Sequence, residues 1–260
     1  MHQLPAKCFQ RQIGKGEGMV TFAHVSAVGG REKNDDCIGT AHMGPEQGFY
    51  ILADGLGGHR GGEVASRTAA DLCRNLYPYH YNDPDLLSLC FTEAQKAIRE
   101  KIGQDPSLEN MRTTLVLLWQ EGSRFSWGHI GDSRLYYFRE GKFAFRTVDD
   151  SVPQMLLNLG EIKEDELASH PDRNRLLAVL GSDTEEVGFH LSEPVIIGSQ
   201  DAFLLCTDGF WEHISEKEME KALKKCTDVS DWLVRMEETV LKNSRPDNRD
   251  NYSALAVLPF

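Results

Sequence analysis

The chain has 260 residues, of which 40% are apolar and 26% are charged, and its net charge is −12. These values are typical of a soluble globular protein with one large domain or two small ones. The acidic balance argues against a nonspecific nucleic-acid surface. No run approaches the roughly 18 consecutive apolar residues of a membrane span, and residues 1–18 lack the apolar stretch of a secretory signal.

The six cysteines contain no C-x-x-C pair, which excludes a zinc ribbon and a thioredoxin-type motif. Most of them lie within apolar runs, as buried thiols do. A reduced, cytoplasmic setting is the simplest explanation of this pattern. The cysteines are Cys8, Cys37, Cys73, Cys90, Cys206 and Cys226.

The first half of the chain predicts an arm, three strands and two amphipathic helices. Apolar residues alternate in the strand at 19–28, form a continuous run at 49–53, and recur every three or four residues in the helices. Asp83 and Pro84 suit the cap and first turn of the second helix. In chain order, the predicted elements are an extended or disordered arm at 1–18, strands at 19–28, 37–41 and 49–53, and helices at 63–77 and 86–103.

The second half predicts more strands, a surface excursion and two further helices. Residues 149–185 combine short helical pieces and many charges without a long apolar strand, which indicates an excursion on the surface of a sheet-based fold. A capping box at 215–218 opens a helix, and Glu140 with Gly141 forms a hairpin turn. The predicted strands cover 113–119, 124–130, 135–138, 142–146, 202–206 and 252–258, and the last helix covers 229–241.

A glycine-rich turn follows the apolar strand at 49–53. Asp54 ends that strand, and five glycines follow among residues 55–62. A strand that delivers one acid into a tight turn suits a site for a cation or a phosphate. The same residues also suit a plain connecting turn with aspartate at its first position.

Five aspartates occupy such positions at the ends of predicted strands. Asp54, Asp132 and Asp208 follow apolar strands, whereas Asp36 and Asp250 precede them. Each aspartate alone suits a turn or a cap, but five in parallel contexts indicate one shared site. Close carboxylates repel each other unless a cation neutralises them, and all-oxygen ligands favour Mg²⁺ or Mn²⁺ over zinc. Two such ions about 4 Å apart would activate a water for attack on a phosphate ester.

These aspartates belong to seven ordered motifs that resemble those of the PP2C-type metal-dependent protein phosphatases over nearly the whole chain. The resemblance implies an α+β fold, a four-layer αββα sandwich in which helix pairs flank a central antiparallel β-sandwich. It also implies one phosphatase domain at 19–260, after the arm at 1–18, with a flap region at 149–185. The motifs are REKNDD at 31–36, DGLGGH at 54–59, RTTLV at 112–116, HIGDSR at 129–134, TVDDS at 147–151, DGFWE at 208–212 and DN at 250–251.

The resemblance implies that two central ions, Mg²⁺ or Mn²⁺, would be held by Asp54, Asp208 and Asp250 together with the carbonyl of Gly55. Oxygen atoms of this kind are the usual ligands of both metals.

The remaining roles concern the surroundings of the central ions. By resemblance, Asp36 would support the first ion through water, and Asp132 would join Asp208 at a weaker third ion. Arg31 would bind the substrate phosphate, because a guanidinium group matches two phosphate oxygens. His59 lies close by in the sequence and is a candidate proton shuttle, although it also suits packing or bonding within the turn.

Four positions depart from the family pattern. Leu56 stands where eukaryotic members often carry histidine, as an apolar residue does in bacterial members. Asp35 replaces a glutamate with a shorter acid, and Arg112 replaces a glycine. Asp150 replaces a histidine in the approach to the flap, which we expect to change substrate preference.

The leading hypothesis is a bacterial, stand-alone phosphatase that acts on phosphoserine and phosphothreonine in proteins and opposes a serine/threonine kinase. A phosphoprotein-binding pseudophosphatase is the alternative, and retention of all the metal aspartates argues against it. A nucleotide-binding protein is a third possibility, but the sequence lacks G-x-x-x-x-G-K-[ST] and has no acid at the ribose-binding spacing of a βαβ unit.

Overall fold

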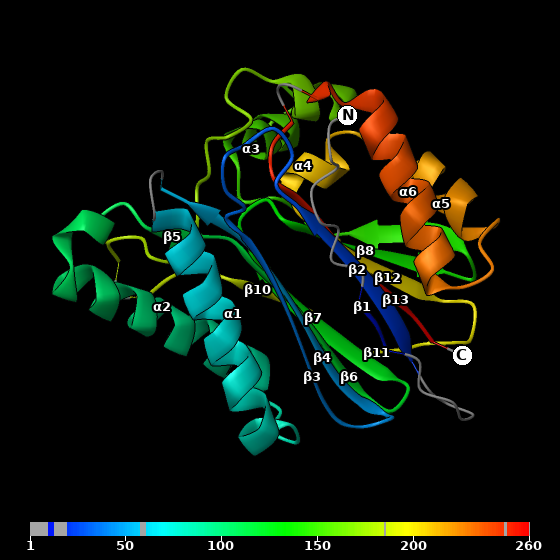
Figure 1. Ribbon diagram of the computed structural model, residues 1–260, viewed down its shortest axis with the longest axis horizontal. Helices are drawn as coiled ribbons and strands as arrows, with labels where there is room; N and C mark the ends of the chain where they lie inside the picture. The colour runs from blue at the N-terminus through cyan, green and yellow to red at the C-terminus, as the bar shows by residue number, and fades with distance from the viewer. Residues whose placement is uncertain (1–9, 13–19, 58–60, 185, 247–248, 260) are drawn as a thin grey trace.

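A computed structural model describes residues 10–12, 20–57, 61–184, 186–246 and 249–259. In this part of the chain, two antiparallel β-sheets lie between two groups of helices (Figure 1). The predicted α+β class and αββα sandwich are confirmed.

The six-stranded sheet has the order β1-β2-β13-β12-β8-β9, so the last strand of the chain is central in it. Part of the predicted arm forms β1, which pairs with β2, and the rest of the arm lies outside the described residues. The strands are β1 (Gln10–Gln12), β2 (Thr21–Ala27), β13 (Tyr252–Leu258), β12 (Ala202–Cys206), β8 (Arg134–Arg139) and β9 (Lys142–Arg146).

The seven-stranded sheet has the main order β10-β7-β6-β4-β3, with β11 paired to β7 and β5 paired to β4. The two-residue strands β10 and β11 were not predicted, because a strand of that length shows no alternation. The strands are β10 (His190–Leu191), β7 (Arg124–Ile130), β6 (Leu115–Glu121), β4 (Gln47–Leu56), β3 (Asp36–Gly44), β11 (Val195–Ile196) and β5 (Arg112–Thr113).

The central strands are apolar throughout because both of their faces are buried. In β13, Ala254 and Ala256 pack in the cluster beneath the helices, whereas Leu255 and Val257 pack between the two sheets. This alternation follows from the period of two along a strand.

One pair of long helices covers the outer face of each sheet (Figure 1). On the seven-stranded sheet, Ala65 and Ala69 of the first helix are fully buried, as their spacing predicted. On the six-stranded sheet, the predicted capping box is present: Ser215 Oγ accepts from the Glu218 N–H, and Glu218 accepts from the Ser215 N–H. The helices are α1 (Gly61–His80), α2 (Leu86–Gln104), α5 (Glu216–Leu223) and α6 (Val229–Asn243), with short turns at η1 (Pro106–Leu108) and α4 (Asp208–Trp211).

Two predicted boundaries were wrong for local reasons. The apolar strand does not end at Asp54, because Gly55 and Leu56 continue β4 and pair with β5. Asp83 does not cap α2: the cap is Asp85, whose backbone N–H donates to the Asp83 carboxylate. Asp83 therefore stabilises the turn that precedes the helix.

The region at 149–185 is a surface excursion without a long strand in its described part. It contains α3 (Val152–Asn158) and η2 (Glu164–Ser169), and Ser151 Oγ caps α3 by accepting from the Gln154 N–H. The excursion returns to the sheet where Leu180 exchanges two backbone hydrogen bonds with Thr113.

The structure also bears on the cysteines and on the absence of a long apolar run in the sequence. The five described cysteines are free thiols, and Cys8 lies outside the described residues. Among the described helices, none is both long enough and apolar enough to cross a membrane.

Candidate active site

One end of the sandwich brings the five predicted aspartates together. Asp36 and Asp54 are direct register partners across β3 and β4. Asp208 follows β12 and Asp250 lies shortly before β13, so the antiparallel pairing of these two strands places both acids at the same edge. Asp132 follows the end of β7 and is 6% exposed.

Four of these aspartates, Asp54, Asp132, Asp208 and Asp250, line a pocket of about 580 Å³. Asp36 is not part of the lining and lies behind it, where the charges of Asp208 and Asp250 still raise its pKa. The flap contributes Asn174 and Leu176, two residues that the motif search did not select. The other lining residues include Arg31, Asp35, Asp54, Gly55, Asp132, Asp208, Asp250 and Asn251.

The electrostatics of the pocket are those of crowded, poorly solvated acids. Burial, followed by the neighbouring carboxylates, raises the pKa of Asp54 and of Asp132 well above the ordinary value. Burial raises the pKa of Asp36 to about 7 and that of Asp208 to about 6. Within the described residues, no ion pair involves any of these four acids. Among the described residues, the cations in the pocket lining are Arg31, which is paired with Asp250, and Lys33.

The donor set fits hard divalent cations. The pocket lining supplies five carboxylates, which Mg²⁺ and Mn²⁺ prefer as ligands: Asp35, Asp54, Asp132, Asp208 and Asp250. Oδ1 of Asp35 and Oδ1 of Asp36 are buried and have no hydrogen-bond partner among the described residues. Buried polar atoms are normally paired, so these two oxygens are suited to ordered water or metal-bound water.

Two threonines fix the position of Asp54. The Asp54 N–H donates to Thr114 Oγ1, and the Asp54 carbonyl accepts from the Thr114 N–H and from Thr113 Oγ1. Thr114 Oγ1 also lies 2.8 Å from Ser133 Oγ, next to Asp132. Two motifs that are far apart in the sequence are thereby joined around the acids.

Close backbone contact explains two glycines of the turn. A Cβ on Gly55 would lie 2.1 Å from the Gly62 carbonyl oxygen, and a Cβ on Gly62 would lie 2.6 Å from that of Gly55. Neither position can therefore hold a side chain without moving the backbone. Residues 58–60 are not described, so His59, the candidate proton shuttle, lies outside the described residues.

Asn251 holds the loop that carries Arg31 and Asp36. Its amide nitrogen donates to the carbonyls of Val28 and Lys33, and its Oδ1 accepts from the Asp35 N–H. The sequence reasoning matched Asn251 to a motif but gave it no role. An amide suits this position because its nitrogen donates hydrogen bonds and its oxygen accepts one.

A threonine that the sequence reasoning missed contacts the cluster directly. Thr207 Oγ1 donates to Asp36 Oδ2 at 3.1 Å and accepts from the Ser253 N–H at 2.9 Å. Thr207 immediately precedes Asp208. In the sequence, this position next to a strand-end acid was the only sign that Thr207 belongs to the site.

Arg31 lies at the rim of the pocket. Its guanidinium group donates to Asp250 Oδ2 at 2.6 Å, and its side chain is 60% exposed. Asp250 Oδ1 accepts from the Asn251 N–H. The candidate phosphate ligand and a candidate metal ligand are thus already in contact, with the guanidinium still accessible.

A buried network positions Asp132 from the opposite side. The Asp132 carbonyl accepts from the indole N–H of Trp211 at 3.0 Å. The guanidinium of Arg134 lies 3.4 Å from the centre of a Trp211 ring and binds both carboxylate oxygens of Asp149. Trp211 therefore supports the backbone of Asp132, and Arg134 packs against Trp211, whereas Asp132 itself lines the pocket.

The flap is attached to this end of the sandwich by an ion pair. Arg173 lies 3.3 Å from Glu212, which immediately follows α4. Burial, together with the charge of Asp208, raises the pKa of Glu212 to about 7, although the charge of Arg173 acts in the opposite direction. Asn174 and Leu176, which follow Arg173 closely in the chain, line the same pocket as the acids.

Comparison with known proteins agrees with this geometry. The profile described as protein phosphatase 2C matches residues 26–248. The chain belongs to the protein phosphatase 2C family. The family resemblance expected from the seven motifs is confirmed.

Similar proteins include bacterial members of the family. The serine/threonine protein phosphatase PstP of Mycobacterium tuberculosis is 34% identical over 77% of this chain, which spans only 38% of the length of PstP. The serine/threonine phosphatase stp of Listeria innocua is 30% identical, over 87% of this chain and 90% of its own. The crystal structure of the PstP catalytic domain, in complex with two manganese ions, is 29% identical with a TM-score of 0.74, covering 92% of this chain and 98% of its own.

Proposed function

We propose that this protein is a metal-dependent phosphatase that hydrolyses phosphoserine and phosphothreonine in proteins. The observation that carries the proposal is the convergence of Asp54, Asp132, Asp208 and Asp250 on one pocket with Asp36 behind it. Among the described residues, four of these five acids form no ion pair. Membership of the protein phosphatase 2C family supports it. A serine/threonine kinase that adds the phosphate is the partner enzyme implied by this activity.

We assign the central metal ligands to Asp54, Asp208, Asp250 and the carbonyl of Gly55. The two manganese ions of the similar PstP catalytic domain support a pair of Mg²⁺ or Mn²⁺ ions here. When bound, the ions would activate water and neutralise charge on the phosphate. Asp36 would act through water from behind the pocket, and a weaker third ion would use Asp132 with Asp208.

The other residues bind and orient the substrate. Arg31 would hold two phosphate oxygens, because its guanidinium is at the rim and remains accessible. Contact with Asp250 limits the orientations of the guanidinium before substrate arrives. Asn174 and Leu176 would contact the peptide around the phosphorylated residue. His59 stays our candidate for proton transfer to the leaving alkoxide.

We also propose the division of the chain into an arm at 1–18 and one domain at 19–260, with 149–185 as the flap. A reduced, cytoplasmic compartment is our proposal as well, and the free thiols of the five described cysteines support it.

Hydrolysis of p-nitrophenyl phosphate and of a phosphothreonine peptide tests the function. We expect no turnover after treatment with EDTA and recovery on addition of Mn²⁺ or Mg²⁺. Asp208→Asn, which keeps the shape of the side chain, should be inactive at every metal concentration. Full turnover in metal-free buffer would contradict the metal-dependent mechanism, and binding of the phosphopeptide without turnover in Mn²⁺ would favour a pseudophosphatase.

A further inference from the structure

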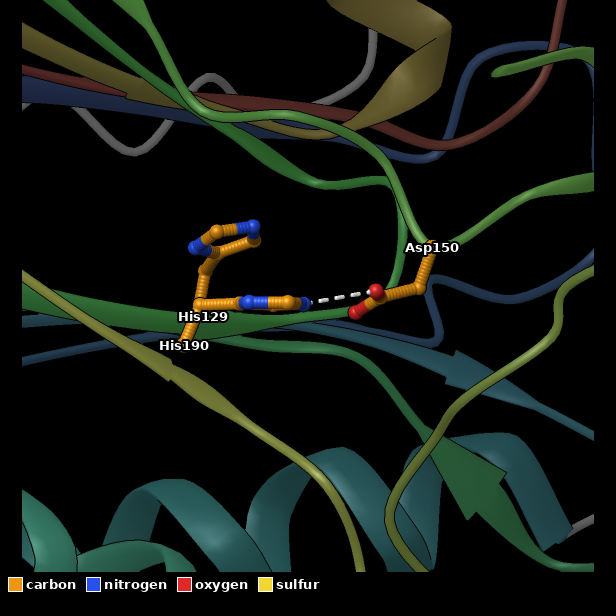
Figure 2. A group of neighbouring side chains, drawn as sticks. All are labelled: His129, Asp150 and His190. Carbon is orange, nitrogen blue, oxygen red and sulfur yellow. Dashed lines mark hydrogen bonds and ion pairs between the residues drawn. The ribbon is translucent and has the colours of Figure 1, made fainter. Parts of the chain in front are cut away.

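A cluster of two histidines and one aspartate lies outside the acidic pocket (Figure 2). His129 of β7 and His190 of β10 are direct register partners, and their rings stack with centroids 4.8 Å apart. Nε2 of His190 lies 2.9 Å from Oδ1 of Asp150, in the loop after β9. One candidate ligand atom from each residue lies within 4.8 Å of the other two.

The aspartate is held firmly by backbone contacts. Its Oδ2 accepts from the Gly131 N–H at 3.0 Å, and its own N–H donates to the Gly131 carbonyl. Its carbonyl accepts from the Leu177 N–H at 2.7 Å. Asp150 therefore presents Oδ1 to the histidines in a fixed position, as a carboxylate ligand requires.

The buried histidine is also prepared to bind a metal. Nε2 of His129 lies 2.9 Å from the Val148 carbonyl. A carbonyl only accepts, so Nε2 carries the proton and Nδ1 keeps a free lone pair. Metal-binding histidines commonly donate their other N–H to a carbonyl in this way. Burial lowers the pKa of His129 and favours the neutral ring, which is the form that binds metals.

We propose that His129, His190 and Asp150 form a binding site for Zn²⁺ or a similar divalent transition-metal ion. Two imidazoles and a carboxylate are typical zinc ligands, and Mg²⁺ binds such nitrogen donors poorly. Three protein ligands leave a fourth position for water. None of the three residues lines the acidic pocket, so the site is separate from the one assigned to catalysis.

The candidate ligand atoms lie within 4.8 Å of one another, so they must move closer, and the stacked rings must turn, to share one ion. Metal–nitrogen distances near 2.0–2.1 Å place tetrahedral ligands about 3.3 Å apart, and the His190–Asp150 pair is already closer than this. The His190 side chain is 58% exposed, so it can turn and also gives the ion access from solvent. A bound ion would link β7, β10 and the first residues of the flap region.

Zinc binding can be tested without reference to turnover. Zn²⁺ is titrated calorimetrically into the full chain in excess Mg²⁺, with wild type, His190→Ala and His80→Ala compared. His80 is a matched control, because it pairs with Asp83 at 3.4 Å in the same way but lies outside the cluster. We expect His190→Ala to bind Zn²⁺ at this site at least about tenfold more weakly, and His80→Ala to match wild type.

Co²⁺ gives a second readout that distinguishes this site from the aspartates. Nitrogen ligands in a four-coordinate site give intense visible absorption, whereas six oxygen ligands give weak bands. We expect intense bands in wild type and their loss in Asp150→Asn, which preserves the shape of the aspartate. Equal Zn²⁺ affinity and stoichiometry in wild type and His190→Ala would overturn the proposal, as would a wild-type protein that binds no Zn²⁺ or shows only weak Co²⁺ bands.

Discussion

Two sets of acids at the same end of the sandwich differ in how their charge is balanced. Asp149 is almost fully buried, and the Arg134 guanidinium binds both of its oxygens at 2.8 and 2.7 Å. Asp54 and Asp132 lie near enough to feel neighbouring carboxylates, yet neither forms an ion pair within the described residues. Asp149, which stabilises the fold, is paired with a cation of the protein itself. The acids that have no such partner are suited to bind a cation from solution.

The difference has an energetic meaning. A buried ion pair offsets the cost of desolvating its two charges only while both partners remain. Crowded acids without a partner raise each other's pKa and oppose folding when they ionise. The fold tolerates the destabilising effect of these crowded acids at one pocket. Functional sites commonly contain such locally unfavourable charges.

The largest expected effect comes from removing acids of the pocket. Asp208→Ala should abolish turnover and weaken all metal binding, because Asp208 is the ligand that we assign to both the central ions and the third ion. Asp132→Ala should keep the central pair, since Asp54, Gly55, Asp208 and Asp250 remain. Its turnover should still fall about a hundredfold, which is comparable to the loss of one electrostatic contributor to the transition state.

Calorimetric titration with Mn²⁺ beside steady-state rates separates the two variants. Loss of the tight metal sites in both variants would show that the division into a central pair and a third site is wrong. Full metal binding and full turnover in Asp132→Ala would leave Asp132 as a structural residue of the turn after β7.

The sequence was enough to predict that each of these acids lies at a strand end or within a motif. It was not enough to predict which side chain each acid contacts. Asp54, Asp132 and Asp208 all follow apolar runs, and strand ends in one sheet meet at shared edges. Asp149 was visible within TVDDS, yet its pairing with Arg134 depends on how β8 and β9 align after the hairpin. Sequence spacing cannot fix such a contact, because it depends on tertiary packing.

The second expected effect is a loss of stability on breaking the balanced pair. Arg134→Ala removes the guanidinium that binds both oxygens of Asp149, leaves only the more distant Arg146 at 3.8 Å, and also removes the contact with Trp211. The free energy of unfolding should fall by about 3–5 kcal/mol. Chemical denaturation measures the change, and Arg74→Ala is the control, since its pair with Asp71 is half exposed and should contribute at most about 1 kcal/mol.

A smaller effect than 3 kcal/mol for Arg134→Ala would mean that water or another group compensates Asp149 readily. The paired and unpaired acids would then not differ in their contribution to the free energy of unfolding, even if the hydrogen bonds between Arg134 and Asp149 are present.

The third expected effect concerns the cation at the rim of the pocket. Arg31→Ala should raise KM about tenfold or more, because a charge-assisted contact to the phosphate is lost. Arg67→Ala is a suitable control, since Arg67 forms an exposed pair with Glu63 on α1. An unchanged KM with a much lower kcat would instead assign Arg31 to the transition state.

The contacts that position the flap show a second limit of sequence reasoning. The excursion at 149–185 was identified by composition, but nothing in its pattern selected Asn174 or Leu176 as pocket residues. Their placement follows from tertiary contacts, which include the bridge between Ser151 and Leu176 and the ion pair between Arg173 and Glu212. The same applies to Asn251, whose motif was recognised but whose three hydrogen bonds were not.

The smallest expected effect is the pH dependence of the metal-free protein. Burial raises the pKa of Asp36 from 3.8 to about 7, so the folded chain binds this proton more tightly than the unfolded chain does. Stability should therefore be lost as the pH rises from about 4 to about 7, because the unfolded chain ionises first. Asp36→Asn cannot ionise and should escape this loss. In EDTA at pH 8, the variant should melt at a higher temperature than wild type.

The difference between the two proteins should be small near pH 4, where Asp36 is protonated in the folded chain and only about half ionised in the unfolded chain. Saturating Mn²⁺ at pH 8 should reverse the order, because a bound cation favours the ionised carboxylate and wild type gains more from it. Thermal melts of both proteins at pH 4 and pH 8, each with EDTA or with Mn²⁺, test these expectations together. If metal-free wild type is at least as stable as Asp36→Asn at pH 8, Asp36 is already compensated by the protein itself and belongs with Asp149 among the balanced acids.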